Sequence, residues 1–228
     1  MEIERITYNS GIEVQAWPQI VQISPLSMPR PPAIPGLING QLSAVWVAFR
    51  LQDLNSQWRQ LIDLFEKRDF QRYHFHVEAT LVSMKRVIDD LIMGAYCIHK
   101  EADIADSFNI PIDGWGVLFR KEKLTALGAE IIERFVGEYD SFPDILNELV
   151  NALKHSYLMA EARNQWSNDY PLVCAYYAHR NDYSGLVRVH EHDMTELVLG
   201  FNKFVLQVLI KTHPLSVGGV MPLEWRPG

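Results

Sequence analysis

Seven apolar residues recur at alternating intervals of four and three between residues 75 and 99. They are Val77, Leu81, Met84, Ile88, Leu91, Ala95 and Ile98. This spacing forms one apolar stripe along an α-helix, so it predicts a helix over 75–99 that packs against other helices. Apolar spacing also predicts helices over 42–65, 121–139, 144–163 and 194–212. We therefore expect a mainly α protein built as a four- or five-helix bundle.

Two β-hairpins are expected beside this bundle. Residues 9–11, Asn-Ser-Gly, separate the segments ERITY and IEVQAW, which predicts a hairpin at the N-terminus. In the C-terminal half, the segments LVCAYYA and GLVRVH flank a polar turn and predict a second hairpin over about 172–190. Residues 101–118 interrupt the helical spacing, and the proline and glycines among them predict a loop.

Six of the twelve prolines lie between residues 18 and 35. Neither a helix nor a central strand can run through such a cluster. The apolar residues between the prolines predict an arm that packs on other parts of a protein, because a linker would be more polar. We therefore divide the chain into a hairpin with a proline-rich arm (1–41), a helical bundle domain with the inserted hairpin (42–213) and a tail (214–228).

The charge balance and the absence of some motifs restrict the function. With 21 Lys and Arg against 28 Asp and Glu, the net charge of -7 argues against a broad DNA-binding surface, although a local basic patch stays compatible with it. We find no secretory signal and no apolar run of about 18 residues, so we expect no membrane partner. Two distant cysteines without a CxxC spacing fit the cytoplasm. We expect no cofactor, since no glycine-rich phosphate loop is present.

Asn151 and His155 are the candidate catalytic residues. They lie four positions apart in the helix predicted over 144–163, so their side chains are neighbours away from the apolar arc of Leu149 and Leu153. An imidazole with an ordinary pKa of about 6.5 can act as an acid or a base when it is held in a cleft. Lys154 beside them is a candidate binding residue. The alternative is a solvated helix face that carries an Asn–His pair.

The pattern Asn151-x-x-x-His155 on a late helix resembles HEPN-domain proteins, small helical bundles with an Arg-Asn-x-x-x-His pattern. The resemblance covers about 42–212. Many members are metal-independent ribonucleases, in which Arg and His from two protomers meet at a dimer interface, and others are non-catalytic. In this sequence Val150 occupies the position of the Arg. The resemblance therefore implies a non-catalytic binding or regulatory module that forms a homodimer through the face of Asn151 and His155.

Two other functions stay open, so the sequence leaves undecided whether the protein is an enzyme. A metal-independent ribonuclease would use His155 as acid or base and take an Arg from elsewhere, such as Arg163 or Arg86. A metal-binding bundle would use His190 and His192, which point to one face if they lie on a strand. We assign no residue as a metal ligand.

The second hairpin concentrates aromatic and cationic side chains. They are Tyr176, Tyr177, His179, Arg180, Tyr183, Arg188 and His190. Aromatic rings with interleaved Arg can stack on single-stranded bases, whereas packing of the hairpin is an alternative use for the rings. Tyr177, Arg180 and Tyr183 are the candidate binding residues here. We expect a homo-oligomer, with a protein or RNA as a further partner.

Overall fold

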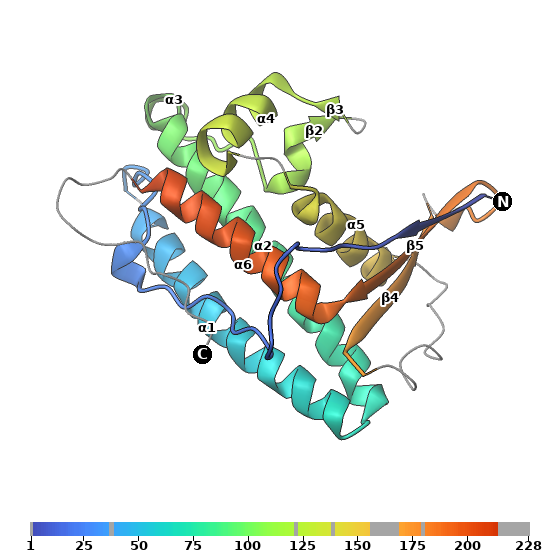
Figure 1. The fold of residues 1–228 in the computed structure, drawn as a ribbon. Helices are drawn as coiled ribbons and strands as arrows, with labels where there is room; N and C mark the ends of the chain where they lie inside the picture. Colours follow the sequence, from blue (N-terminus) through green and yellow to red (C-terminus); the bar gives the residue numbers. More distant parts are fainter. Residues whose placement is uncertain are drawn as a thin grey trace. The chain divides into compact units, whose positions relative to one another are not determined.

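The computed structural model describes residues 2–36, 39–120, 123–137, 140–155, 169–178 and 181–213. Helices make up most of this part of the chain (Figure 1). The α-helices are α1 (Asn39–Glu66), α2 (Phe70–His99), α3 (Glu101–Ser107), α4 (Ala126–Ile131), α5 (Phe142–His155) and α6 (Met194–Thr212). The shorter turns are the 3-10 helices η1 (Pro25–Ser27) and η2 (Trp115–Leu118) and the π-helix η3 (Ile132–Val136). The prediction of a mainly α fold is confirmed.

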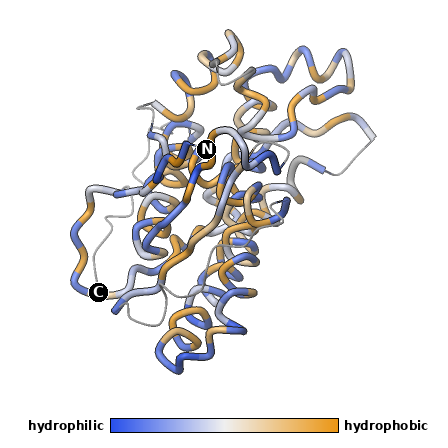
Figure 2. Tube along the Cα trace, turned by 90° about the vertical axis from the view of Figure 1, so that its right-hand side faces the viewer, coloured by the Kyte–Doolittle hydropathy of each residue, from blue (hydrophilic) through white to orange (hydrophobic). Residues whose placement is uncertain are grey.

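The helices that were predicted from apolar spacing are present, with some changes at their ends. The helices over 42–65, 75–99 and 194–212 are confirmed, and the first two begin earlier, at Asn39 and Phe70. In α2, six of the seven residues of the apolar stripe are buried. Figure 2 shows hydrophobic and hydrophilic residues alternating along the helices, as expected where one face is buried. No described helix combines the length and the apolar character needed to cross a membrane.

Two predicted helices and one predicted loop need correction or lie partly outside the described residues. The helix predicted over 121–139 is shorter, because α4 begins only after Thr125, whose hydroxyl accepts a hydrogen bond from the N–H of Gly128 (2.9 Å). The loop predicted over 101–118 contains α3, so the described residues hold six α-helices instead of four or five. The helix predicted over 144–163 is observed as α5 to His155, and its remainder lies outside the described residues.

A three-stranded sheet has β5 (Leu186–Asp193) at its centre. The strand β4 (Leu172–Tyr177) pairs antiparallel with β5, with Tyr177 opposite Arg188, which confirms the hairpin in the C-terminal half. The strand β1 (Glu2–Ile6) pairs parallel with the other edge of β5, with Glu4 also opposite Arg188. Figure 1 shows β1 and β4 on either side of β5. A separate two-stranded ladder consists of β2 (Phe119–Arg120) and β3 (Lys123–Leu124).

The prediction of an N-terminal hairpin is wrong. Residues 12–17 form no strand, and β1 pairs with β5 instead. Residues 9–11 do form a turn, in which the Asn9 side chain accepts from the N–H of Gly11 (2.7 Å), but the N–H of Ser10 donates to Glu196 (2.6 Å). The ring of Trp17 then packs edge-on against Trp58. Local turn chemistry permits a hairpin, but the second segment is used for packing and does not pair with β1.

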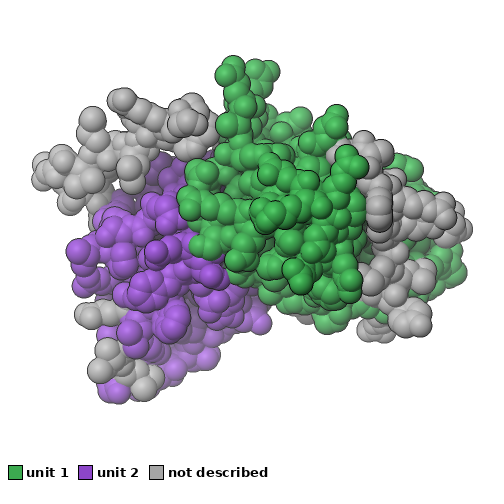
Figure 3. Space-filling model, turned by 90° about the horizontal axis from the view of Figure 1, so that it is seen from below, with its two compact units in different colours: residues 1–20, 54–85, 141–201 green, residues 21–53, 86–140, 202–228 purple. Residues whose placement is uncertain are grey.

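The chain divides into two compact units, each assembled from segments that are distant in sequence (Figure 3). Unit 1 consists of Met1–Ile20, Leu54–Lys85 and Ser141–Phe201, and unit 2 of Val21–Asp53, Arg86–Asp140 and Asn202–Gly228. The domain boundaries inferred from the sequence, 1–41, 42–213 and 214–228, stay predictions. The tail over 214–228 lies outside the described residues.

Each unit has its own apolar core with a few buried polar bonds. In unit 1, the indole N–H of Trp58 donates to the carbonyl of Pro18 (2.7 Å), and the hydroxyl of Tyr73 donates to the carbonyl of Leu172 (2.7 Å). In unit 2, the buried carboxylate of Asp89 accepts from the backbone N–H of Trp115 (3.0 Å). Met28 of the proline-rich arm is buried in the same unit, so the prediction that this arm packs on the protein is confirmed.

Candidate binding surface on α5 and the β4–β5 hairpin

The helix α5 has one apolar face and one polar face. It begins at Phe142-Pro143, and the carboxylate of Asp144 in its first turn suits the positive end of the helix dipole. Its apolar face is fully buried in unit 1, through Leu146, Leu149 and Val150. Val150 is 0% exposed, so the position where the HEPN pattern carries an Arg belongs to the core.

The polar face of α5 carries both candidate catalytic residues and one further acid. Glu148, Asn151 and His155 lie three and four positions apart, so they follow one line along the helix. Exposure increases along this line, since Glu148 and Asn151 are half-buried and His155 is exposed. The buried end of the polar face therefore meets the sheet, and its C-terminal end meets solvent.

Arg188 on β5 binds two carboxylates that come from two other elements. Its Nη1 donates to Glu148 on α5 (2.5 Å), and its Nε donates to Glu4 on β1 (2.9 Å). The hydrogen bond to Glu148, together with the bond to Glu4, raises the pKa of Arg188 above its ordinary value. Burial by itself acts to raise the pKa of Glu148, but His190 and Arg188 outweigh it and hold this pKa below the ordinary value. One guanidinium thus ties α5, β5 and β1 together.

His190 and His192 form a buried pair next to this ion pair. They lie on one face of β5, and their side chains are 0% and 1% exposed. The Nδ1 of His190 is 3.0 Å from the Nε2 of His192, and the Nε2 of His190 is 3.5 Å from Glu148. Burial, with a smaller effect of His190, lowers the pKa of His192 to about 3. The two facing nitrogens can share one hydrogen bond, whereas Nε2 of His190 and Nδ1 of His192 have no hydrogen-bond partner among the described residues.

The buried histidines lack two features of a reactive site, which are contact with solvent and further metal-ligating side chains. Because they are fully buried, a substrate cannot contact them in this conformation. Among the residues that the structure describes, no three His, Cys, Asp or Glu side chains are arranged to hold a metal ion. The pair instead lies between the sheet and α5, where Nε2 of His190 is 3.5 Å from Glu148.

The tip of the β4–β5 hairpin is joined to the end of α5. The side chain of Asn181 donates to the backbone carbonyl of His155 (3.0 Å), and the hydroxyl of Tyr183 donates to Asn181 (3.1 Å). These bonds join the hairpin tip to the last described residue of α5. Asn181 has a φ of 59°, a left-handed conformation that Asn adopts more readily than most residues.

The structure thus brings together some of the residues predicted for a site. His155 and Tyr183 meet through Asn181, with Lys154 exposed beside them and Asn151 one turn earlier. Tyr177 is half-buried on β4, opposite Arg188. Arg180 and Arg163 lie outside the described residues. Within unit 2, Arg86 pairs with Asp90 (3.1 Å).

Sequence reasoning missed two residues that organise this surface, Glu148 and Asn181, and it noted Arg188 only as one of the hairpin's cationic side chains. The sequence did contain a pattern that indicates Glu148. This residue precedes His155 by seven positions, so the two side chains share one helix face. A pattern also indicates Asn181, as a turn-forming residue between two strands. The role of Arg188 depends on β1, whose pairing no local pattern indicated.

Comparisons with known proteins assign no family to this chain. Neither protein-family models nor curated proteins match it, and no solved structure matches its fold. The resemblance to HEPN domains therefore rests on Asn151, His155 and the helical plan, and the function has to be inferred from the surface itself.

Substituting Glu148 will show how much the buried ion pair stabilises unit 1. We expect Glu148→Gln to lower the free energy of unfolding by about 2 kcal/mol at pH 7.5, since it leaves Arg188 and His190 without their shared carboxylate. Glu4→Gln is the matched control, because Glu4 binds the same guanidinium but is 47% exposed against 19% for Glu148. It should cost less than about 1 kcal/mol. Urea unfolding followed by circular dichroism measures both, and equal losses would contradict the assignment.

Proposed function

We propose that this chain is a non-catalytic binding module that assembles with a second copy of itself. The proposed surface is the end of α5 with the tip of the β4–β5 hairpin, and it contains Asn151, Lys154, His155, Asn181 and Tyr183. The observation that supports it best is the hydrogen bond from Asn181 to the carbonyl of His155. This bond holds a helix end and a hairpin tip, which are distant in sequence, as one preorganised surface.

The chemistry of the surrounding residues favours binding over catalysis. Cleavage of RNA without a metal needs a cation that stabilises the developing charge on the phosphate. Val150 is buried at the position of the family's Arg, and the guanidinium of Arg188 is engaged by Glu148 and Glu4. Neither position 150 nor Arg188 therefore supplies a guanidinium that could act together with the exposed imidazole of His155.

The charge of the chain favours a protein partner over RNA. The net charge is -7, and the hairpin tip adds an exposed acid, Asp182, to a surface whose exposed cation on α5 is Lys154. Nucleic-acid affinity depends mainly on several Lys and Arg contacts to phosphates. A half-buried Tyr183 beside exposed polar side chains is more typical of a protein interface.

Reversing the charge of this surface tests the proposal. We expect wild type to form dimers in sedimentation velocity between about 1 and 100 µM, and Lys154→Glu with His155→Glu to raise the dissociation constant at least about tenfold, since an interface tolerates like charges poorly. Lys67→Glu, at another exposed lysine of unit 1, is a charge-reversal control for Lys154→Glu and should dimerise as wild type does.

Two results would overturn the proposal. One is a wild-type chain that stays monomeric over the whole concentration range. The other is cleavage of RNA in EDTA by wild type but not by His155→Ala, because this would make His155 a catalytic residue and revive the ribonuclease alternative.

A further inference from the structure

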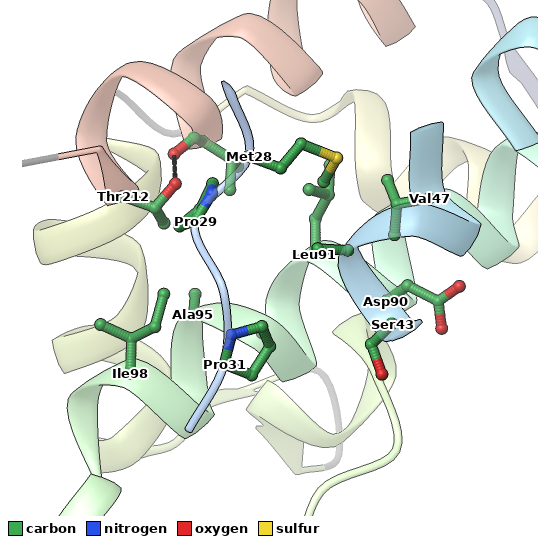
Figure 4. Close-up of a pocket in the computed structure, with 13 residues that line it drawn as sticks. Met28, Pro29, Pro31, Ser43, Val47, Asp90, Leu91, Ala95, Ile98 and Thr212 are labelled. Atoms are coloured by element: carbon green, nitrogen blue, oxygen red, sulfur yellow. Dashed lines mark hydrogen bonds between the residues drawn. The ribbon is translucent and has the colours of Figure 1, made fainter. Parts of the chain in front are cut away.

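Two buried contacts of this chain differ in their chemistry. In unit 2, the proline-rich arm fills the groove lined by α1, α2 and α6, and only about 30 Å³ of it stays empty (Figure 4). In unit 1, Arg188, His190 and His192 alternate along β5, so they share the face of the strand that meets Glu148 of α5. Imidazoles change their charge more readily near neutral pH than other side chains, so the contact in unit 1 is the one that acid can affect.

A chain of polar groups crosses the contact between α5 and the sheet. Arg188 donates to Glu4 on β1 (2.9 Å) and to Glu148 on α5 (2.5 Å). Glu148 in turn lies 3.5 Å from Nε2 of His190, and Nδ1 of His190 faces Nε2 of His192 at 3.0 Å. The chain ends there, because Nδ1 of His192 has no hydrogen-bond partner among the described residues. His190 therefore lies beside a carboxylate, whereas the polar neighbour of His192 is His190 itself.

The surroundings of the pair offer one acid. Among the described residues, Glu148 is the one carboxylate within 4 Å of either ring, and Asp144 lies one helical turn before it on α5. On β4, the residues opposite the pair carry no charge; they are Ala175 and Val173. The ionisable side chains that alternate with the pair point to the other face of the sheet; they are Cys174, Glu191 and Asp193, which act on Tyr73 of α2 or on one another. A positive charge on His192 thus has no counter-charge while the contact is closed.

The distance between the two rings limits how many protons the closed contact can hold. With neutral rings, or with one added proton, one facing nitrogen donates and the other accepts. When both rings are protonated, every ring nitrogen is a donor, so the hydrogen bond at 3.0 Å is lost and two positive charges meet in a fully buried contact. Glu148 can pair with a charged His190 but not with His192. In agreement with this geometry, burial and His190 lower the pKa of His192 to about 3.

We infer that this histidine pair opens the contact between α5 and the β4–β5 hairpin in acid, and that this opening dismantles the proposed dimer surface at the end of α5. Local separation of α5 from the hairpin gives water access to the second charge. It also breaks the hydrogen bond from Asn181 to the carbonyl of His155, which holds the two parts of that surface together. The effect on the dimer rests on the proposed function, whereas the opening itself does not.

Hydrogen exchange of the full chain, followed by mass spectrometry, measures the opening. The open form takes up a proton on His192 below pH 6.5, and the closed form binds it only near pH 3. We therefore expect the opening constant of the α5 amides to increase about thirtyfold from pH 7.5 to pH 5, after correction for the intrinsic effect of pH on exchange. At pH 5 it should exceed the global unfolding constant from urea at least about tenfold, because the opening is local.

Substitution of the histidines tests which group is responsible. Glutamine does not titrate, so the opening constant of His192→Gln should change less than about threefold over the same range. His213→Gln is the control, because it exchanges an exposed imidazole of unit 2, and it should keep the wild-type response. If His192→Gln loses its helical signal in circular dichroism, His190→Gln replaces it. The glutamine oxygen can accept from a protonated His192, so this variant should also respond less to acid.

Sedimentation velocity at pH 7.5 and pH 5 tests the consequence for the dimer. We expect the dissociation constant of wild type to increase at least about threefold at pH 5, since only the closed form carries the complete surface. In His192→Gln the dissociation constant should stay nearly constant. A chain that is monomeric already at pH 7.5 would overturn the proposed function, and hydrogen exchange would then decide the inference by itself.

Three outcomes would overturn the inference. The first is an opening constant of α5 that equals the global unfolding constant at pH 5, because α5 would then separate only when the whole chain unfolds. The second is a wild-type response to acid that the histidine variants keep in full. The third is a wild-type dimer that is equally tight at both pH values although α5 opens, because the opening would then not act on the dimer surface.

Discussion

We expect wild type to lose stability between pH 6.5 and pH 5, and His192→Gln to remove much of this loss. The pKa of His192 is about 3 in the folded chain and 6.5 ordinarily. The unfolded chain therefore takes up a proton below pH 6.5 that the folded chain does not bind. The contribution of His192 is complete above pH 6.5 and decreases as the pH falls toward 3. At about 1.4 kcal/mol per pKa unit, we expect a loss of about 2 kcal/mol by pH 5 in wild type.

Urea unfolding at pH 7.5, 6.5, 5.5 and 5 measures this loss. Glutamine keeps a donor and an acceptor for His190 but does not titrate, so the variant should have a flatter profile. This range stays above the ordinary pKa of 4.5 of Glu148, whose own contribution is lost only at lower pH. The control is His155→Gln, which exchanges an exposed imidazole and should keep the wild-type profile. An equally steep profile for His192→Gln would show that His192 is not the group responsible.

Gly114→Ala will lower the free energy of unfolding by about 3 kcal/mol. Gly114 has a φ of +143°, a conformation that residues with a Cβ rarely adopt. Its Cβ would also overlap the carboxylate of Asp89, which accepts the N–H of Trp115. The substitution therefore adds backbone strain and disrupts a buried hydrogen bond on which the packing of Trp115 depends.

Gly11→Ala separates these two effects. Gly11 also has a positive φ, +71°, but a Cβ there would meet no atom within 4 Å. It should therefore cost only about 1 kcal/mol, the part that comes from the backbone. Thermal and urea unfolding of the two variants give the comparison. Similar losses would mean that the contact of Gly114 with Asp89 contributes nothing beyond conformation.

The α-helices show where sequence patterns are reliable and where they fail. The stripe from Val77 to Ala95 is buried as its spacing predicts, because each helical neighbour lies three or four positions away. The helix predicted over 121–139 was too long, since the hydroxyl of Thr125 caps α4 and the chain continues as the π-helix η3. The short α3 was missed because its seven residues, Glu101–Ser107, bury only Ile104 and so show no apolar stripe.

The candidate surface was predicted only in part. The line of Asn151 and His155 on one helix face follows from their spacing, and so does the shared face of His190 and His192 on β5. That His192 is fully buried, and that Asn181 binds the end of α5, could not be foreseen. Both depend on which element packs against the hairpin, and α5 is not its neighbour in sequence.

Local sequence patterns were enough to predict the long helices, the position of the β4–β5 hairpin and the side chains that share a face. These features depend on residues a few positions apart, so local sterics and apolar spacing are enough to specify them. The pairing of β1 with β5, and the bonds of Arg188 to Glu4 and Glu148, depend on tertiary packing. Glu4 and Glu148 lie 184 and 40 positions from Arg188 in the sequence. Almost any strand can pair with β5 through its backbone, and a carboxylate can bind any guanidinium. The partners are therefore selected by the apolar surface that each arrangement buries.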